Sequence, residues 1–149
     1  MEIIEIIHYN RNVYIRRKPI VIWVRNMVSQ TDFTCQNKTA DGKEVHILIT
    51  SGIVANVDVF SVKKMVDTAR QKLVGNITWV VFCPIAERST LEDEGRTCRF
   101  PLRWIDRSIK ENIYAILDDY GSVEALQRSA NDKYITTQYV LTLLFANEY

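Results

Sequence analysis

The strongest periodic pattern in the chain lies in residues 58–74. Its apolar side chains recur three and four positions apart, and four basic residues lie among the other positions; the apolar set is Val62, Met65, Val66, Ala69 and Leu73. Because residues at that spacing share one side of an α-helix, the pattern predicts a helix with one buried face. Asp58 is a favourable N-cap, and Gly75 is a favourable stop signal.

Short apolar runs before and after this segment predict β-strands, because they are rich in β-branched and aromatic residues. The runs are residues 3–7, 13–15, 20–24, 45–50 and 77–83. Turn signals at residues 10–12 and at Asp41-Gly42 predict two hairpins, of which the second spans residues 32–50. The run at 77–83 is continuous, as is typical of a strand buried on both faces. Strand, helix and strand in this order predict a right-handed parallel crossover.

The second half of the chain contains three further apolar patterns. Residues 85–100 are read as a charged loop, and residues 108–120 predict a second helix that Gly121 ends. Ser122 is expected to cap a short helix that continues through Ala130. The last run, residues 134–145, fits a helix or a strand, and we prefer the helix.

These elements predict one α/β or α+β domain over residues 1–149. It would contain a mixed sheet of about five strands with helices 58–74 and 108–120 packed on it. A chain of 149 residues is long enough to bury about 68–70% of its unfolded surface. The expected core includes Val62, Met65, Val66, Ala69, Trp79, Val81, Ile113, Ile116 and Leu117.

Charge and cysteine content place the protein inside the cell. The formal net charge is only +1, so any attraction to nucleic acid must come from a local patch. No apolar run approaches the roughly 20 residues of a membrane span, and the first residues are acidic where a signal peptide is basic. The three cysteines, at positions 35, 83 and 98, are scattered, which favours reduced thiols over a disulfide framework. We therefore expect an intracellular protein that is not secreted and makes no membrane contact.

The residues suited to chemistry or charged contacts are few. The two histidines, His8 and His46, have no ligand spacing, and the five glycines do not cluster, so no metal site, phosphate loop or cofactor is predicted. The acidic residues of the 85–100 loop are interleaved with arginines and are read as solvated. The candidate nucleic-acid patch, which Lys63, Lys64 and Lys72 could extend, is Arg11, Arg16, Arg17, Lys18 and Arg25.

The segment from Asp32 to Gly52 has the order of elements found in PD-(D/E)xK nucleases. Such an enzyme needs an acid on one strand, then an acid and a lysine two positions apart on the next, to bind a metal and activate water. The second strand here offers only apolar residues and threonine at those positions. In the alternative, enzymatic reading, Asp32 and Glu44 would hold Mg²⁺ while Lys43 or His46 polarises water. An active enzyme is the less favoured reading.

Four segments carry a resemblance to a known family: Thr31-Asp32-Phe33-Thr34, the strand at 45–49, the helix start at 60–65, and Asn76-Ile77-Thr78 leading into residues 79–82. Over residues 31–84 the chain resembles the N-terminal jaw domain of the fifth shared subunit of eukaryotic-type RNA polymerases. The resemblance implies a restriction-endonuclease-like frame without catalytic residues. Residues 101–149 do not match that subunit's C-terminal assembly domain, and strands replace its first helices. The resemblance therefore implies a divergent or reduced relative, such as a viral protein.

The resulting functional expectation is a non-enzymatic protein-interaction subunit of an intracellular, nucleic-acid-handling assembly of the transcription type. Aromatic residues beyond the needs of the core would anchor its protein partners; these are Tyr9, Tyr14, Trp23, Trp104 and Tyr149. Contact with nucleic acid would be weak and independent of sequence. The alternative function is the metal-dependent nuclease with displaced catalytic groups.

Overall fold

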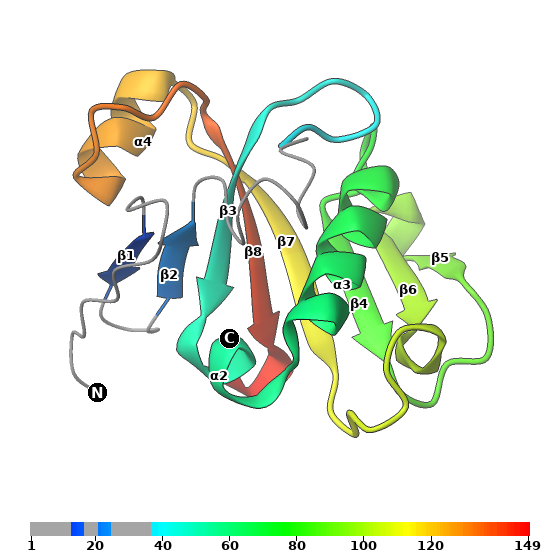
Figure 1. Cartoon of the computed structure of the whole chain (residues 1–149). Helices are drawn as coiled ribbons and strands as arrows, with labels where there is room; N and C mark the ends of the chain where they lie inside the picture. The colour runs from blue at the N-terminus through cyan, green and yellow to red at the C-terminus, as the bar shows by residue number, and fades with distance from the viewer. Residues whose placement is uncertain (1–12, 17–20, 25–36) are drawn as a thin grey trace.

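The computed structural model describes residues 37–149 in full and the backbone of two further strands (Figure 1). These strands are β1 (Val13–Arg16) and β2 (Val21–Val24). The predicted strand at residues 3–7, the first hairpin turn and most of the segment before Asn37 lie outside the described residues.

The described strands form one mixed sheet in the order β1-β2-β3-β8-β7-β4-β6-β5. The remaining strands are β3 (Val45–Thr50), β4 (Trp79–Cys83), β5 (Thr90–Glu92), β6 (Thr97–Pro101), β7 (Ile113–Asp119) and β8 (Tyr139–Phe145). The pairs β3–β8 and β4–β6 are parallel, and the other neighbours are antiparallel. Consequently β4 runs in the same direction as β3, with β8 and β7 between them. The mixed α/β fold class is therefore confirmed.

The helices cover the two faces of this sheet (Figure 1). Helices α2 (Ser51–Asn56) and α3 (Val59–Lys72) pack over the main core, which includes Ile47 and Ile49 of β3. Helix α4 (Val123–Ala130) packs over Leu48 and Val140. Because successive side chains of a strand point to opposite faces, α3 and α4 lie on opposite sides of the sheet.

The helix predicted at 58–74 is confirmed with its cap. The Asp58 carboxylate accepts hydrogen bonds from the backbone N–H groups of Phe60 and Ser61, at 2.9 and 3.0 Å. Gly75, at φ +58, lies two residues beyond the C-cap Leu73, in the left-handed region that favours glycine. The short helix after Ser122 is also confirmed, because the Ser122 hydroxyl accepts from the Ala125 N–H at 3.0 Å.

The helix predicted at 108–120 is wrong, and so is the preference for a helix at 134–145. Residues 113–119 and 139–145 are instead β7 and β8, which pair with each other near the middle of the sheet. Both runs are apolar on consecutive positions, as befits strands buried on two faces. The loop predicted at 85–100 also contains strands, β5 and β6. Four of the eight described strands, β5 to β8, were therefore not predicted as strands.

The expected core is correct except on β4. Val62, Met65, Val66, Ala69, Ile113, Ile116 and Leu117 are buried. Trp79 and Val81 are only half-buried, while Val80 and Phe82, which alternate with them, are fully buried under α3. The continuous apolar run of β4 predicts burial on both faces, but in this half of the sheet the described helices cover one face only.

Candidate functional site

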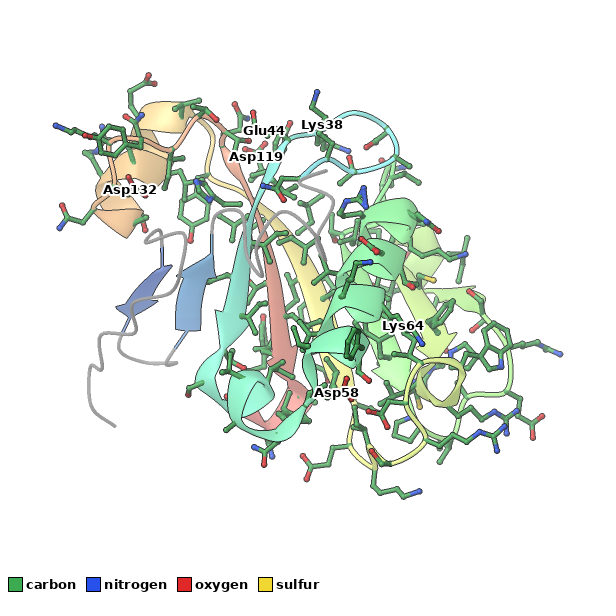
Figure 2. The ribbon with its side chains drawn as sticks, viewed as in Figure 1. Lys38, Glu44, Asp58, Lys64, Asp119 and Asp132 are labelled. Atoms are coloured by element: carbon green, nitrogen blue, oxygen red, sulfur yellow. The ribbon has the colours of Figure 1, made fainter. Side chains whose placement is uncertain are left out.

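Two residues of the alternative catalytic set, Glu44 and Lys43, make contacts with different partners. The Glu44 carboxylate accepts a hydrogen bond from the Thr136 hydroxyl at 2.8 Å. The Lys43 ammonium is bonded to the Asp41 carboxylate at 2.7 Å. His46 is buried on β3, and Asp32 lies outside the described residues. Glu44 and Lys38 both lie near the end of the sheet where the 39–43 turn projects (Figure 2).

The turn at Asp41-Gly42 is confirmed, and it is fastened to the end of α3. Gly42 adopts φ +93, and the Thr39 N–H donates to the Lys43 carbonyl at 2.8 Å. The Asp41 carboxylate accepts from the Gly75 N–H at 3.0 Å. The Lys43 ammonium, the Thr39 hydroxyl and this N–H together hold the pKa of Asp41 well below its usual range. The Asp41 carboxylate therefore serves a structural role at this turn.

The predicted basic patch lies mostly outside the described residues. Arg11, Arg17, Lys18 and Arg25 are not described, and of Arg16 only the backbone is described, paired with Val21. Its suggested extension on α3 is described, and Lys64 is an exposed member of it.

An aromatic series runs from the core to the surface beside α3. Phe82 of β4 is fully buried, and its ring centroid lies 5.9 Å from that of Phe100 on β6. Phe100 in turn contacts Trp104 edge to face, with ring centroids 5.3 Å apart. Trp104 ends the single turn η2 (Leu102–Trp104) and is 57% exposed. Each ring is fixed by the one beneath it, so the outer indole is presented to solvent on a rigid base.

Helix α3 lies along this series and adds basic side chains to it. The Lys72 ammonium lies 5.9 Å from the centroid of the Phe100 ring, within range of a cation–π contact. Positions 60, 64, 68 and 72 are four apart and therefore follow one stripe of the helix. Lys64 lies on the side of α3 that faces η2 (Figure 2). Phe60, one turn before it, is 65% exposed.

A pair of carboxylates joins the start of α3 to the loop after η2. The Ser61 hydroxyl lies 2.9 Å from both the Asp58 and the Asp106 carboxylates. Hydrogen bonds from Ser61 lower the pKa of Asp58, and hydrogen bonds from Ser108 lower that of Asp106. Both acids are therefore ionised and satisfied within the protein. This contact holds α3 and the η2 loop side by side.

We call this region the α3–η2 surface. It consists of Phe60, Lys64, Lys72, Phe100, Arg103, Trp104 and Arg107. Lys64, Arg103 and Arg107 are exposed, and none of them makes an ion pair with another described residue. The surface therefore combines uncompensated positive charge with exposed aromatic rings.

The other polar groups in the described part of the chain are weaker candidates for a functional site. No group of three or more His, Cys, Asp or Glu side chains within it is placed to hold a metal ion. In the acidic loop, Glu92 pairs with Arg99 and Asp93 with Arg96, as expected of a solvated, interleaved loop. Two surface pockets, of about 480 and 490 Å³, are not lined by Lys43, Glu44 or His46.

Sequence reasoning found some members of the α3–η2 surface but not the surface itself. Lys64 and Lys72 were noted for their charge, and Trp104 was noted as a surplus aromatic residue. Phe60 was noted only as part of the resemblance. What joins them is the packing of Phe100 beneath Trp104 and Lys72, which brings residues from different elements together.

None of the helices that the structure describes is both long and apolar enough to cross a membrane. Comparisons of the chain with protein-family models, with curated proteins and with solved structures give no match.

Proposed function

We propose that this protein is a non-enzymatic interaction subunit of an intracellular, nucleic-acid-handling assembly of the transcription type, and that the α3–η2 surface is its contact site. The proposal also takes the protein to be a divergent relative of the polymerase jaw domain, such as a virus could encode. One observation carries it: Trp104 and Phe60 are exposed to solvent beside basic groups that make no ion pair with another described residue.

An exposed aromatic ring gains free energy when a binding partner covers it, because apolar surface is then removed from water. Aromatic and arginine side chains are the commonest anchors of protein interfaces, because they bury a large area with little loss of conformational freedom. Trp104, Phe60 and Arg103 supply such anchors on one side of the molecule. The rigid support that Phe100 gives to Trp104 lowers the entropic cost of binding further.

Co-purification from the native host tests this proposal. The tagged protein should recover the subunits of a nucleic-acid polymerase or a related assembly, identified by mass spectrometry. The double variant Phe60→Ala/Trp104→Ala should fold normally and lose most of that recovery. Equal recovery by the variant and the parent would show that the contact site lies elsewhere, and recovery of the free protein alone would refute the proposal.

The alternative function is that of a metal-dependent nuclease. It requires Asp32 and Glu44 to share an ion, with Lys43 or His46 beside it. In the folded chain Glu44 accepts a hydrogen bond from Thr136, and Lys43 is paired with Asp41. Purified protein should leave single-stranded and duplex DNA intact in Mg²⁺ or Mn²⁺. Cleavage that disappears in Glu44→Gln would establish the enzyme instead.

A further inference from the structure

We infer that the occupant of the α3–η2 surface is a single-stranded nucleic acid, with bases stacked on Trp104 and Phe60 and phosphates along Lys64, Lys72 and Arg103. This inference rests on the proposed function and names the partner at that contact site.

The aromatic residues favour a partner with flat, accessible rings. Trp104 is 57% exposed and Phe60 is 65% exposed, so both keep a large part of the ring free. The edge-to-face contact with Phe100 helps to hold the Trp104 indole in place. Unpaired bases stack on such rings whatever their identity, and this is how many proteins bind single strands without sequence preference.

The distribution of charge favours a polyanion. Residues 58–74 and 102–110 carry seven basic and three acidic side chains, whereas the rest of the chain carries 12 basic and 15 acidic ones. Two of the three acids, Asp58 and Asp106, are turned to the Ser61 hydroxyl at 2.9 Å. The third, Asp67, is paired with Arg70 at 3.3 Å. A chain with a net charge of only +1 thus concentrates its positive charge beside the exposed rings.

The combination distinguishes a single strand from the other polyanions. A duplex offers phosphates to Lys64 and Lys72, but its bases are already stacked and cannot use Trp104. An acidic peptide would pair with the basic groups and gain little from the rings. Only an unpaired strand engages both the aromatic rings and the basic side chains, since bases free to stack alternate with phosphates along it.

Fluorescence anisotropy with a labelled oligo-dT strand of about 20 nucleotides tests the inference, since a single binding module covers about 4–16 nucleotides. Binding to the full-length protein should be measurable at low salt. Trp104→Ala should weaken it by about 5- to 150-fold, as expected from about 1–3 kcal/mol of stacking per base. Lys64→Ala/Lys72→Ala should lower the slope of log affinity against log salt by up to about 1.4, at roughly 0.7 per phosphate contact.

The chain contains a matched control for these substitutions. Tyr134 is 64% exposed, and the Lys133 ammonium lies 5.4 Å from its ring centroid, so the pair repeats the aromatic and basic chemistry away from α3. Lys133→Ala/Tyr134→Ala should leave the affinity and the salt slope unchanged. Circular dichroism melting of every variant separates lost binding from lost folding. A fall in affinity in the control as large as in Trp104→Ala would overturn the inference.

Competition identifies the partner class. Unlabelled single strand should displace the probe well, and a hairpin duplex or a poly-glutamate peptide should displace it at least tenfold less well. Equal displacement by the peptide, or no binding of oligo-dT at about 50 mM salt, would overturn the inference. The proposed function would survive that result if Phe60→Ala/Trp104→Ala still lost its assembly on co-purification, because the partner there would be a protein.

Discussion

The Thr50 hydroxyl donates a hydrogen bond to the Glu148 carboxylate at 2.7 Å, which joins the end of β3 to the last turn of the chain. Thr50 is fully buried, and its hydroxyl also accepts from the Ile53 N–H at the start of α2. The same carboxylate accepts from the Phe145 N–H at 2.9 Å. A Cβ at Gly52 would lie only 2.6 Å from the other carboxylate oxygen. Any larger side chain at position 52 would therefore have to displace the Glu148 carboxylate.

Gly52→Ala is expected to destabilise the protein by about 1 kcal/mol or more, even though alanine is the better helix former. The new methyl group must push the Glu148 carboxylate off at least one of its two hydrogen bonds, and a buried hydroxyl left without its partner costs about 1–3 kcal/mol. Urea unfolding of the two proteins measures the difference.

The effect of Gly52→Ala on the free energy of unfolding should change sign in a protein that lacks the Glu148 carboxylate. In a Glu148→Ala background the three nearest contacts of the methyl group at position 52, all with the Glu148 carboxylate, are gone, so Gly52→Ala should stabilise by up to about 1 kcal/mol. A double-mutant cycle of the four proteins isolates this coupling. Additive effects would show that Glu148 does not determine the residue at position 52.

Val80→Asp is expected to prevent folding, whereas Val81→Asp should be tolerated better. Val80 is fully buried beneath α3, and a lone buried carboxylate costs several kcal/mol against a total stability of about 5–15 kcal/mol. Val81 points to the opposite face and is half-buried. Thermal melting of the soluble fraction compares the two. A soluble Val80→Asp protein with the parent melting curve would contradict the placement of β4.

The sequence predicted the elements whose signals are local. Asp58 as a cap, Asp41-Gly42 as a turn and the apolar face of α3 all depend on residues a few positions apart. Strands β7 and β8 could not be told from helices, because a short run that is apolar on every position fits both periods. Their pairing, from Ile113 with Phe145 to Asp119 with Tyr139, settles the matter only in the folded sheet.

The candidate site was less accessible from sequence than the fold. Phe60, Phe100 and Trp104 lie on three different elements, and no spacing in the chain marks them as neighbours. Acid and histidine side chains are the usual signs of chemistry in a sequence, so the sequence pointed to Glu44 and His46 rather than to the exposed rings. Only the burial of each side chain in the folded structure distinguishes a core aromatic residue such as Phe82 from an exposed one such as Trp104.

Cys83 and Cys98 are expected to resist alkylation in the native protein. Their exposed fractions are 1% and 2%, and the Cys83 sulfur lies 3.1 Å from the Arg99 guanidinium. A thiol reagent reaches such groups only when the strands open. Iodoacetamide followed by peptide mass spectrometry should label both positions in urea and neither in buffer. Rapid native labelling of Cys98 would mean that β5 and β6 open locally.

Asp41→Asn is expected to lower the free energy of unfolding at neutral pH. In the variant that free energy should also fall less steeply as the pH is lowered. The folded state lowers the pKa of Asp41, because the Lys43 ammonium, the Thr39 hydroxyl and the Gly75 N–H all favour the ionised carboxylate. The unfolded chain therefore binds the proton more readily. The stabilisation is present above the unfolded pKa of about 3.9 and is lost as the pH falls below it.

The free energy of unfolding of both proteins, measured in urea from about pH 7 down to about pH 2.5, tests the sign of this linkage. The two curves should converge below about pH 4, because the unfolded parent then binds a proton at Asp41 that the folded protein does not bind. Asp58 and Asp106 have lowered pKa values as well, but they are present in both proteins and cancel in the difference. Curves that stay parallel across this range would show that the Asp41 carboxylate is not held by Lys43 and Gly75. The 39–43 turn would then stand free of the end of α3.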